Sequence, residues 1–442
     1  MKRLWLIAVL VCAAVIALPI QASSTSARVL TLANISNDGP DSNGDNEVDI
    51  AINPTNPSNL IAAWNDYGPG QSCGLGYSFD GGKTWATSWL RGVTPLGGNA
   101  TFDYGAGDPS VGFLNDGTAV LSCAAWGASK SQPSALFASR SIDGGRNWAP
   151  AQQLTFGQNL GHLQDHNMLT VDRYNNRVLV AYSVWNGYHA LSYARISSDG
   201  GNTYTGPYEI ASDYTKNAVD RFDVSLAAAP DGTIYATTGI WQHVQEWSEQ
   251  AVVVSQLRPG ETAFTRSVKV RDLVPAPMTL PGESWRTSMQ ASIGVEGDGT
   301  VDLLTGDFVT GNLDLFLARS HDHGASFPPA QQANLTNDAT DQVMPWMSVR
   351  PNGRIDVVFY DYDRTTGLMN ADYGQVAAGS TTLATTVVQS GIDGDAQPPR
   401  GAGHSPFMGD YLGIDATDKL VAIAWTGNGP VSQDVFSATL KP

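Results

Sequence analysis

Acidic, basic and aromatic residues recur where short β-like runs of this sequence begin, and their types suit proton transfer and sugar binding. Asp108 and Asp165 could act as a pair of carboxyl groups, the combination that donates and accepts protons when a glycosidic bond is hydrolysed. Asp410 and Tyr411 are the next candidates for catalytic chemistry. The residues at equivalent points that could bind an anionic or hydroxyl-rich substrate group are Arg221, Arg286, His166 and Glu47.

Each candidate also has an ordinary structural explanation. An acidic side chain at the start of a strand often caps a turn or accepts hydrogen bonds from neighbouring backbone. For any single residue this explanation is the stronger one. A set of charged positions that converges on one point of the fold favours a ligand site more than any single member does.

Seven β-like runs end in an aromatic residue, and these aromatic residues recur at a nearly constant interval of about 60 residues. Self-similarity at a fixed period is typical of a repeat architecture. The seven runs are Leu60–Trp64, Ala119–Trp126, Val178–Trp185, Ile234–Trp241, Val301–Phe308, Ile355–Tyr362 and Leu420–Trp425.

Each repeat contains an alternating strand, a turn that is often rich in glycine, the aromatic-ended strand and two further strands. Four strands per repeat at this period are typical of a β-propeller blade. Residues 23–442 have room for seven repeats, so the sequence predicts one all-β domain, a seven-bladed β-propeller of four-stranded blades. The last repeat lacks a fourth strand, and Arg28–Ala33 is an unassigned strand near the start. We therefore expect the N-terminal strand to complete the last blade and close the ring.

Residues 1–22 have the features of a secretory signal peptide, because Lys2 and Arg3 precede an apolar run that ends before a polar stretch. No later segment is long and apolar enough to span a bilayer, so we expect a secreted protein, extracellular or periplasmic. An oxidising compartment would allow Cys73 and Cys123 to pair. The alternative is two buried thiols that never meet.

The net charge of −17 argues against nucleic acid and against an anionic membrane surface as partners, since both bind basic patches. We expect a monomer with no membrane insertion. The acidic excess permits cation binding. Asp41, Asn43 and Asp45 place oxygen ligands at alternate positions, which resembles the start of a calcium loop. A solvated acidic loop is the alternative, and no other cofactor is expected.

Four repeats carry the pattern Ser-x-Asp-x-Gly-x-x-aromatic between the third and fourth strands. The pattern suits a hairpin turn whose carboxylate accepts hydrogen bonds from backbone N–H groups and whose glycine adopts a left-handed conformation. The four copies are Ser78–Trp85, Ser141–Trp148, Ser197–Tyr204 and Ser320–Phe327. In these copies the chain resembles the Asp-box (BNR) repeat β-propellers, a superfamily that includes the bacterial sialidases. The resemblance implies a sialidase-like, glycan-acting glycoside hydrolase whose Asp-box turns are structural and lie away from the active site.

The resemblance to the sialidases themselves is incomplete. Sialidases bind the substrate carboxylate with three arginines, whereas this chain lacks the early Arg-Ile-Pro signature that supplies the first. The chain also predicts seven blades where the sialidase domain has six. Two alternatives to a hydrolase therefore stay open: a non-catalytic propeller that binds a glycan or a protein, and a polysaccharide lyase, which needs a Tyr or His base beside arginine.

Overall fold

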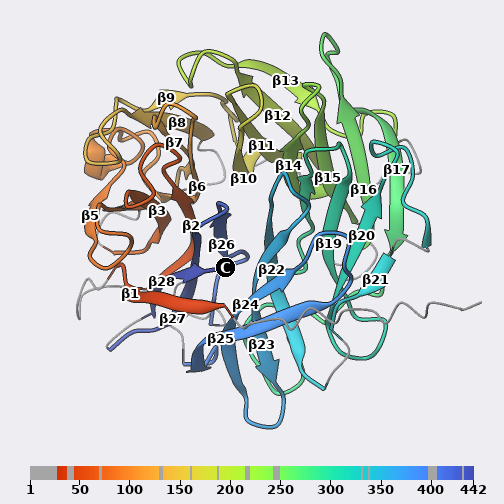
Figure 1. Cartoon of the computed structure of the whole chain (residues 1–442). Helices are drawn as coiled ribbons and strands as arrows, with labels where there is room; N and C mark the ends of the chain where they lie inside the picture. The colour runs from red at the N-terminus through yellow and green to blue at the C-terminus, as the bar shows by residue number, and fades with distance from the viewer. Residues whose placement is uncertain are drawn as a thin grey trace, which may run out of the picture.

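The computed structural model describes residues 27–36, 44–68, 72–128, 133–159, 162–186, 189–214, 220–241, 249–329, 332–336, 339–396, 406–430 and 433–442. Within these residues, seven four-stranded antiparallel sheets are arranged as blades around one axis (Figure 1). The predicted seven-bladed all-β propeller is therefore confirmed. In this described part of the chain, no helix is long and apolar enough to cross a membrane. The predicted signal peptide, residues 1–22, lies outside the described residues.

The first six blades are each built from four consecutive strands, and the first strand of each blade packs against the first strands of its neighbours around the axis. Blades one to three comprise β2 (Asp45–Ile52), β3 (Leu60–Asp66), β4 (Ser72–Ser78) and β5 (Ala86–Trp89), then β6 (Gly105–Phe113), β7 (Ala119–Trp126), β8 (Ser134–Ser141) and β9 (Gln152–Gln153), then β10 (Leu163–Asp172), β11 (Arg177–Asn186), β12 (His189–Ser197) and β13 (Thr205–Glu209). Blades four to six comprise β14 (Asp220–Ala228), β15 (Ile234–Trp241), β16 (Glu249–Leu257) and β17 (Thr265–Asp272), then β18 (Ser292–Val295), β19 (Val301–Asp307), β20 (Asp314–Ser320) and β21 (Gln332–Asn334), then β22 (Asp341–Val349), β23 (Ile355–Asp363), β24 (Leu368–Val376) and β25 (Leu383–Ile392). A short 3-10 helix, η1 (Pro95–Gly97), lies between blades one and two.

Blade seven joins the two ends of the chain. It contains β26 (Gly413–Ala416), β27 (Val421–Asn428) and β28 (Gln433–Lys441), and β1 (Arg28–Asn34) pairs antiparallel with β28 as its outer strand. The hydroxyl groups of Thr31 and Thr439 add a 2.7 Å hydrogen bond between these two strands. The expected closure of the ring by the N-terminal strand is confirmed.

One predicted strand boundary is wrong. The sequence predicts a strand over Thr287–Val295, but β18 begins only at Ser292. The preceding segment, residues 273–291, connects blade four to blade five and buries Leu280 and Trp285 in the apolar core of blades six and seven. Burial of these large apolar side chains stabilises the detour, because each removes most of its surface from water.

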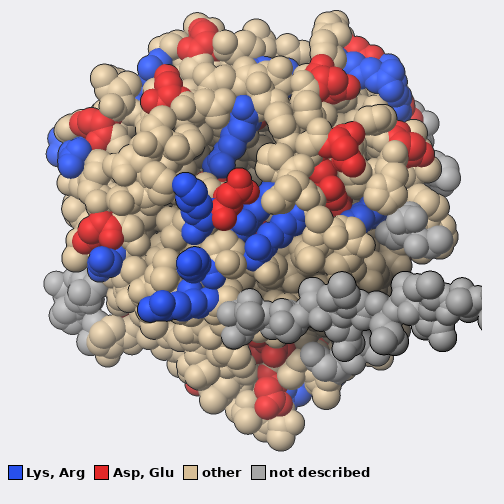
Figure 2. All heavy atoms as spheres, viewed as in Figure 1, with Lys and Arg blue, Asp and Glu red and all other residues tan. Residues whose placement is uncertain are grey.

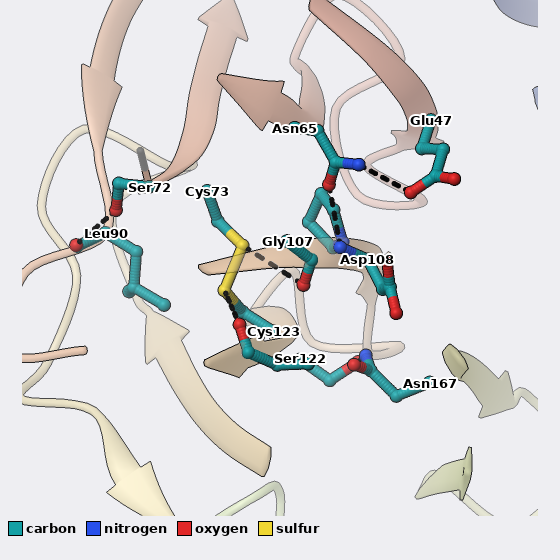
Figure 3. The surroundings of a disulfide bond; sticks show 12 residues. Glu47, Asn65, Ser72, Cys73, Leu90, Gly107, Asp108, Ser122, Cys123 and Asn167 are labelled. Carbon is teal, nitrogen blue, oxygen red and sulfur yellow. Dashed lines mark hydrogen bonds between the residues drawn. A yellow bond between two sulfur atoms is a disulfide. The ribbon is translucent and has the colours of Figure 1, made fainter. Parts of the chain in front are cut away.

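A disulfide joins Cys73 on β4 to Cys123 on β7, with 6.5 Å between the two Cα atoms (Figure 3). Both cysteines lie in the buried apolar cluster between blades one and two. The alternative of two separate thiols is therefore excluded. The bridge links neighbouring blades close to Asp108, since the Cys73 Sγ atom lies 3.5 Å from the carbonyl oxygen of Gly107.

The four motif turns, defined as the copies of Ser-x-Asp-x-Gly-x-x-aromatic, have the hydrogen bonds that the pattern predicts. In the first copy Asp80 Oδ1 accepts from the backbone N–H groups of Lys83 and Thr84, both at 3.0 Å. Gly82 has a φ of 82°, the left-handed region that only glycine adopts readily. The turns connect third and fourth strands, so they lie at the end of the blades opposite to the start of the inner strands.

Candidate functional site

Five inner strands share one unusual backbone feature. Each has a β-bulge, and at the bulge a residue other than glycine has a positive φ between 50° and 55°. The five residues are Glu47, Asp108, His166, Asp223 and Met344. Bulges re-aim side chains, and backbone strain of this kind collects at functional sites. Four of the five residues are titratable.

His166 lies at the centre of this ring. Its backbone N–H donates to Asp108 Oδ2 at 2.8 Å, and its Nε2 lies 3.1 Å from Gln290 Oε1 and 3.7 Å from Asp223 Oδ1. Its ring is also edge-on to Tyr411, with 6.2 Å between the ring centroids. These four partners belong to blades two, four, five and seven, so His166 must lie at the axis. We use the name axial cluster for Glu47, Asp108, Asp165, His166, Asp223, Gln290 and Tyr411.

Asn65 connects Glu47 to this group. Its Nδ2 donates to Glu47 Oε2, and its Oδ1 accepts from the backbone N–H of Asp108 at 2.7 Å (Figure 3). The Asn65 amide therefore links Glu47 in blade one to Asp108 in blade two, and both residues have a positive φ. Asn65 was missed in the sequence because nothing marks it beyond its place at the end of an aromatic-ended run.

Asp165 has the properties of a proton donor. Burial, followed by the negative charge of Asp108, raises its pKa to about 6, although His166 and a hydrogen bond from Trp185 act in the opposite direction. The Trp185 Nε1–H donates to Asp165 Oδ2 at 3.1 Å. A hydrogen bond between the carboxyl groups of Asp108 and Asp165 adds to the rise in pKa. Asp108 and Asp165 are both half-buried residues.

Asp223 is a second carboxyl group with a raised pKa. It is buried, and burial raises its pKa to about 7. The charge of His166 acts against this rise, and that of Asp410 reinforces it. Asp223 is therefore largely protonated, and so uncharged, in mildly acidic solution.

An aromatic wall lies beside Asp165. The Phe222 ring is 4.8 Å from Trp185, 5.2 Å from His166 and 6.0 Å from Trp241, measured between ring centroids. Half-buried aromatic faces next to carboxyl groups are a combination that binds sugars. Trp185 and Trp241 are closing residues of the sequence repeat, and their second strands end where the inner strands begin. That periodicity was the signal that could have placed them at the site.

Tyr411 lies at the axis with its hydroxyl group fully engaged. The side chain is buried, and its OH donates to the carbonyl oxygen of Pro109 at 3.1 Å. Burial, with the charges of Glu47 and Asp108, raises its pKa well above the usual value. Tyr411 therefore stays protonated and holds blade seven against blade two.

Arg286 and Asp410 are brought together at the rim of the axial cluster. The guanidinium Nε donates to Asp410 Oδ1 at 3.0 Å, and Nη2 contacts Oδ2. The Phe407 ring lies against the guanidinium group, 4.7 Å from its carbon. The segment between blades four and five, residues 273–291, thus carries Arg286 to blade seven.

Arg221 does not join the axial cluster. Its buried guanidinium group donates to the carbonyl oxygens of Ile210 and Ala211 and to Glu209 Oε1 at 2.7 Å. These partners lie at and after β13, the outer strand of blade three. The burial of this charge is compensated by groups of the protein itself, so the side chain is directed away from His166.

The residues of the expected calcium loop fall mainly outside the described residues. Asp41 and Asn43 are not described, and Asp45 is a buried residue of β2. Among the described residues, no group of three or more His, Cys, Asp or Glu side chains is arranged to hold a metal ion. Calcium binding therefore stays a prediction.

The opposite end of the axis contains a cavity of about 390 Å³. Side chains that line it include Ser110, Trp346, Arg173 and Asp415. Arg173 Nη2 contacts both carboxylate oxygens of Asp415, at 2.9 and 2.8 Å. Figure 2 shows one face of the propeller, with Lys and Arg side chains, and an acidic group among them, gathered around a hollowed centre.

Comparisons with known proteins relate the chain to others by structure. No family model matches the sequence, and no curated protein matches it. The GH93 α-L-arabinofuranosidase of Fusarium graminearum, solved with arabinobiose, is similar with a TM-score of 0.52 at 12% identity, over 93% of this chain and 98% of that chain. The α-L-arabinanase of Penicillium chrysogenum, also with arabinobiose, gives 0.51 at 13% identity, over 94% and 98%. The Hadza microbial sialidase Hz136 gives 0.50 at 16% identity, over 79% and 66%. At these identities the similarity establishes a shared propeller fold.

Proposed function

We propose that this protein is a glycoside hydrolase that binds its glycan at the axial cluster. The observation that carries the proposal is Asp165, a half-buried residue whose carboxyl pKa is raised to about 6 and whose carboxylate accepts a hydrogen bond from the aromatic wall. A general acid works best when its pKa lies near the working pH, and a sugar ring needs an aromatic face against which to lie. Asp165 and Trp185 supply these two requirements within one hydrogen bond of each other.

Asp165 is assigned the role of proton donor. It gives its proton to the glycosidic oxygen as the bond between that oxygen and the anomeric carbon breaks. Water supplies the hydroxyl group of the new reducing end, and the proton that this water releases returns Asp165 to its acid form. The negative charge of Asp108 raises the pKa of Asp165 and so favours its protonated form. We therefore assign Asp108 to the protonation of Asp165 and not to attack on the sugar.

Sialic acid is not the substrate that the site favours. A tyrosine nucleophile needs a readily lost proton, whereas the pKa of Tyr411 is raised well above its usual value. Arg286 is already paired with Asp410, and Arg221 is directed elsewhere. The arabinofuranosidase and the arabinanase of the same fold support the broader class of glycan hydrolysis by analogy of fold.

We also propose that the protein acts outside the cytoplasm. The Cys73–Cys123 disulfide supports this location, since such bonds persist in oxidising compartments. The signal-like segment at residues 1–22 supports it independently.

A non-catalytic glycan-binding propeller is the second candidate. It is favoured because His166 and Tyr411 already form hydrogen bonds with Gln290 and with the carbonyl oxygen of Pro109. A polysaccharide lyase has less support, because the same contacts leave neither residue ready to act as a base.

A glycoside screen separates these candidates. The purified protein is incubated with aryl glycosides of common neutral sugars, including α-L-arabinofuranosides, and with aryl α-sialosides, and binding is followed in parallel by calorimetry. Turnover by the wild type but not by Asp165→Asn supports the hydrolase. Binding without turnover of any member supports the binding propeller and refutes the hydrolase.

A further inference from the structure

Arg286 pairs with Asp410, the residue that directly precedes Tyr411 in the chain, so it borders the axial cluster. Its Nε and Nη2 atoms form the two-pronged edge that recognises a carboxylate, and Asp410 occupies that edge. The Phe407 ring covers one face of the guanidinium group. A substrate carboxylate would have to displace Asp410 before it could use this edge of Arg286.

The segment that carries Arg286 is firmly attached to its surroundings. Trp285 is fully buried, its Nε1–H donates to Glu283 Oε2 at 2.6 Å, and its ring is edge-on to Tyr362. Ser284 donates through both its backbone N–H and its hydroxyl group to Asp395 Oδ1, at 2.9 and 2.6 Å. These bonds fix the segment on both sides of the Trp285 ring. Arg286 is therefore held beside Asp410 before any ligand arrives.

The remaining charges around the axis are acidic. Glu47 and Asp108 face Tyr411, and Asp165 and Asp410 both act on Asp223. His166 is the other basic group that acts on these carboxyl groups. Glu47 and Asp108, and Asp165 once it has given up its proton, would repel a negatively charged ligand, and the repulsion is stronger in a partly buried site than in water.

We infer that the axial cluster accepts uncharged glycans and excludes carboxylated ones, and that Asp410 determines this specificity by neutralising Arg286. The inference rests on the proposed function, since it concerns the glycan that the same site binds. Hydroxyl groups can share the outer edges of a paired guanidinium and carboxylate, whereas a substrate carboxylate must either break the pair or lie beside the negative charge of Asp410. Specificity of this kind comes from an unfavourable interaction with the wrong ligand.

Matched pairs of substrates test the inference. Each pair consists of a neutral aryl glycoside and the uronide of the same ring stereochemistry, for example a galactoside and a galacturonide, and both turnover and binding are measured. The wild type is expected to prefer the neutral member. Asp410→Asn leaves Arg286 without its counter-charge, so the ratio of uronide to neutral kcat/KM is expected to rise by roughly tenfold.

Two further variants control for charge and folding. Asp410→Glu keeps the carboxylate and is expected to keep the wild-type preference. Asp418→Asn makes the same change in net charge at an exposed residue between β26 and β27, at the opposite end of the axis, and is expected to leave the ratio unchanged. Equal shifts in Asp410→Asn and Asp418→Asn would overturn the assignment of Asp410.

The outcomes separate this inference from the proposed function. Preference of the wild type for the uronide overturns the inference and leaves the hydrolase intact. Binding of the neutral members without turnover retains the inference and refutes the hydrolase. No binding of either member of any pair refutes both.

Discussion

The axial cluster and the four motif turns place aspartates in opposite environments. In the cluster, burial raises the pKa of Asp165 to about 6 and that of Asp223 to about 7. In the turns, hydrogen bonds from Thr203 lower the pKa of Asp199 to about 2, and those of Ser320 and Ser326 do the same for Asp322. Desolvation controls the first pair and donated hydrogen bonds control the second. The environment of an aspartate therefore indicates its role better than its place in a repeat does.

The largest expected effect is on catalysis, and it tests whether aspartates of the axial cluster and of the motif turns differ in function. Asp165→Asn removes the proposed proton donor, so we expect kcat for glycoside hydrolysis to fall by about 10²–10⁴-fold. Asp199→Asn is the matched control, because it makes the same chemical change in a motif turn. Similar losses of activity in both variants would show that the two regions do not differ in function.

The disulfide beside the axial cluster is a covalent link that stabilises the blades on which the cluster is built. Replacing Cys73 and Cys123 by alanine opens a loop of 50 residues. Loop-closure entropy then predicts a loss of roughly 4 kcal/mol in the free energy of unfolding. Urea unfolding of the double variant and of the wild type measures the loss. An unchanged midpoint would argue that the contacts between blades one and two suffice without the bridge.

The pH profile tests how the carboxyl pair works. Because Asp165 must be protonated, activity is expected to fall as the pH rises through about 6. The charge of Asp108 raises the pKa of Asp165, so Asp108→Asn is expected to move this limb to lower pH. Initial rates between pH 4 and 8 give the two profiles. If the fall in activity occurs at the same pH in Asp108→Asn as in the wild type, Asp108 does not control the protonation of Asp165.

The smallest expected effect is on thermal stability. Replacing an aspartate by asparagine should change Tm in opposite directions in the axial cluster and in the motif turns. The raised pKa of Asp223 means that its contribution to stability is present in acid and is lost as the pH rises through about 7. Asp223→Asn is therefore expected to raise Tm relative to the wild type at pH 8 and to change it little at pH 5.

Asp199 is the matched residue of opposite sign. Its lowered pKa contributes stability above about pH 4, which is lost as the pH falls towards 2. Asp199→Asn is expected to lower Tm at pH 5 by a small amount, because the side chain is exposed. Thermal scans of both variants at several pH values measure the change in Tm relative to the wild type. Changes of the same sign in the two variants would contradict the expected difference between the regions.

The architecture could be predicted because it depends on a period. The aromatic-ended runs and the unassigned strand at Arg28–Ala33 were sufficient to predict seven blades and their closure. The predicted strand over Thr287–Val295 was wrong because Trp285 packs against Tyr362, a residue of the next blade. Such a contact between distant segments leaves no local pattern in the sequence.

The candidate site could be predicted only in part. Asp108, Asp165 and His166 were found from their position at the start of the inner strands, and the structure brings them together. Arg221 occupies a similar sequence position, yet its side chain binds the end of β13. The direction of an arginine side chain depends on which partners compensate its burial, and these partners are set by tertiary packing.

The central claim is that the glycan binds at the axial cluster and not at the cavity on the opposite end of the axis. A crystal structure of Asp165→Asn soaked with the glycoside that the wild type hydrolyses fastest tests this claim most directly. We predict that the sugar lies against Trp185 with its glycosidic oxygen within hydrogen-bonding distance of residue 165. A sugar bound instead beside Arg173 and Asp415, with the axial cluster unchanged, would contradict the account.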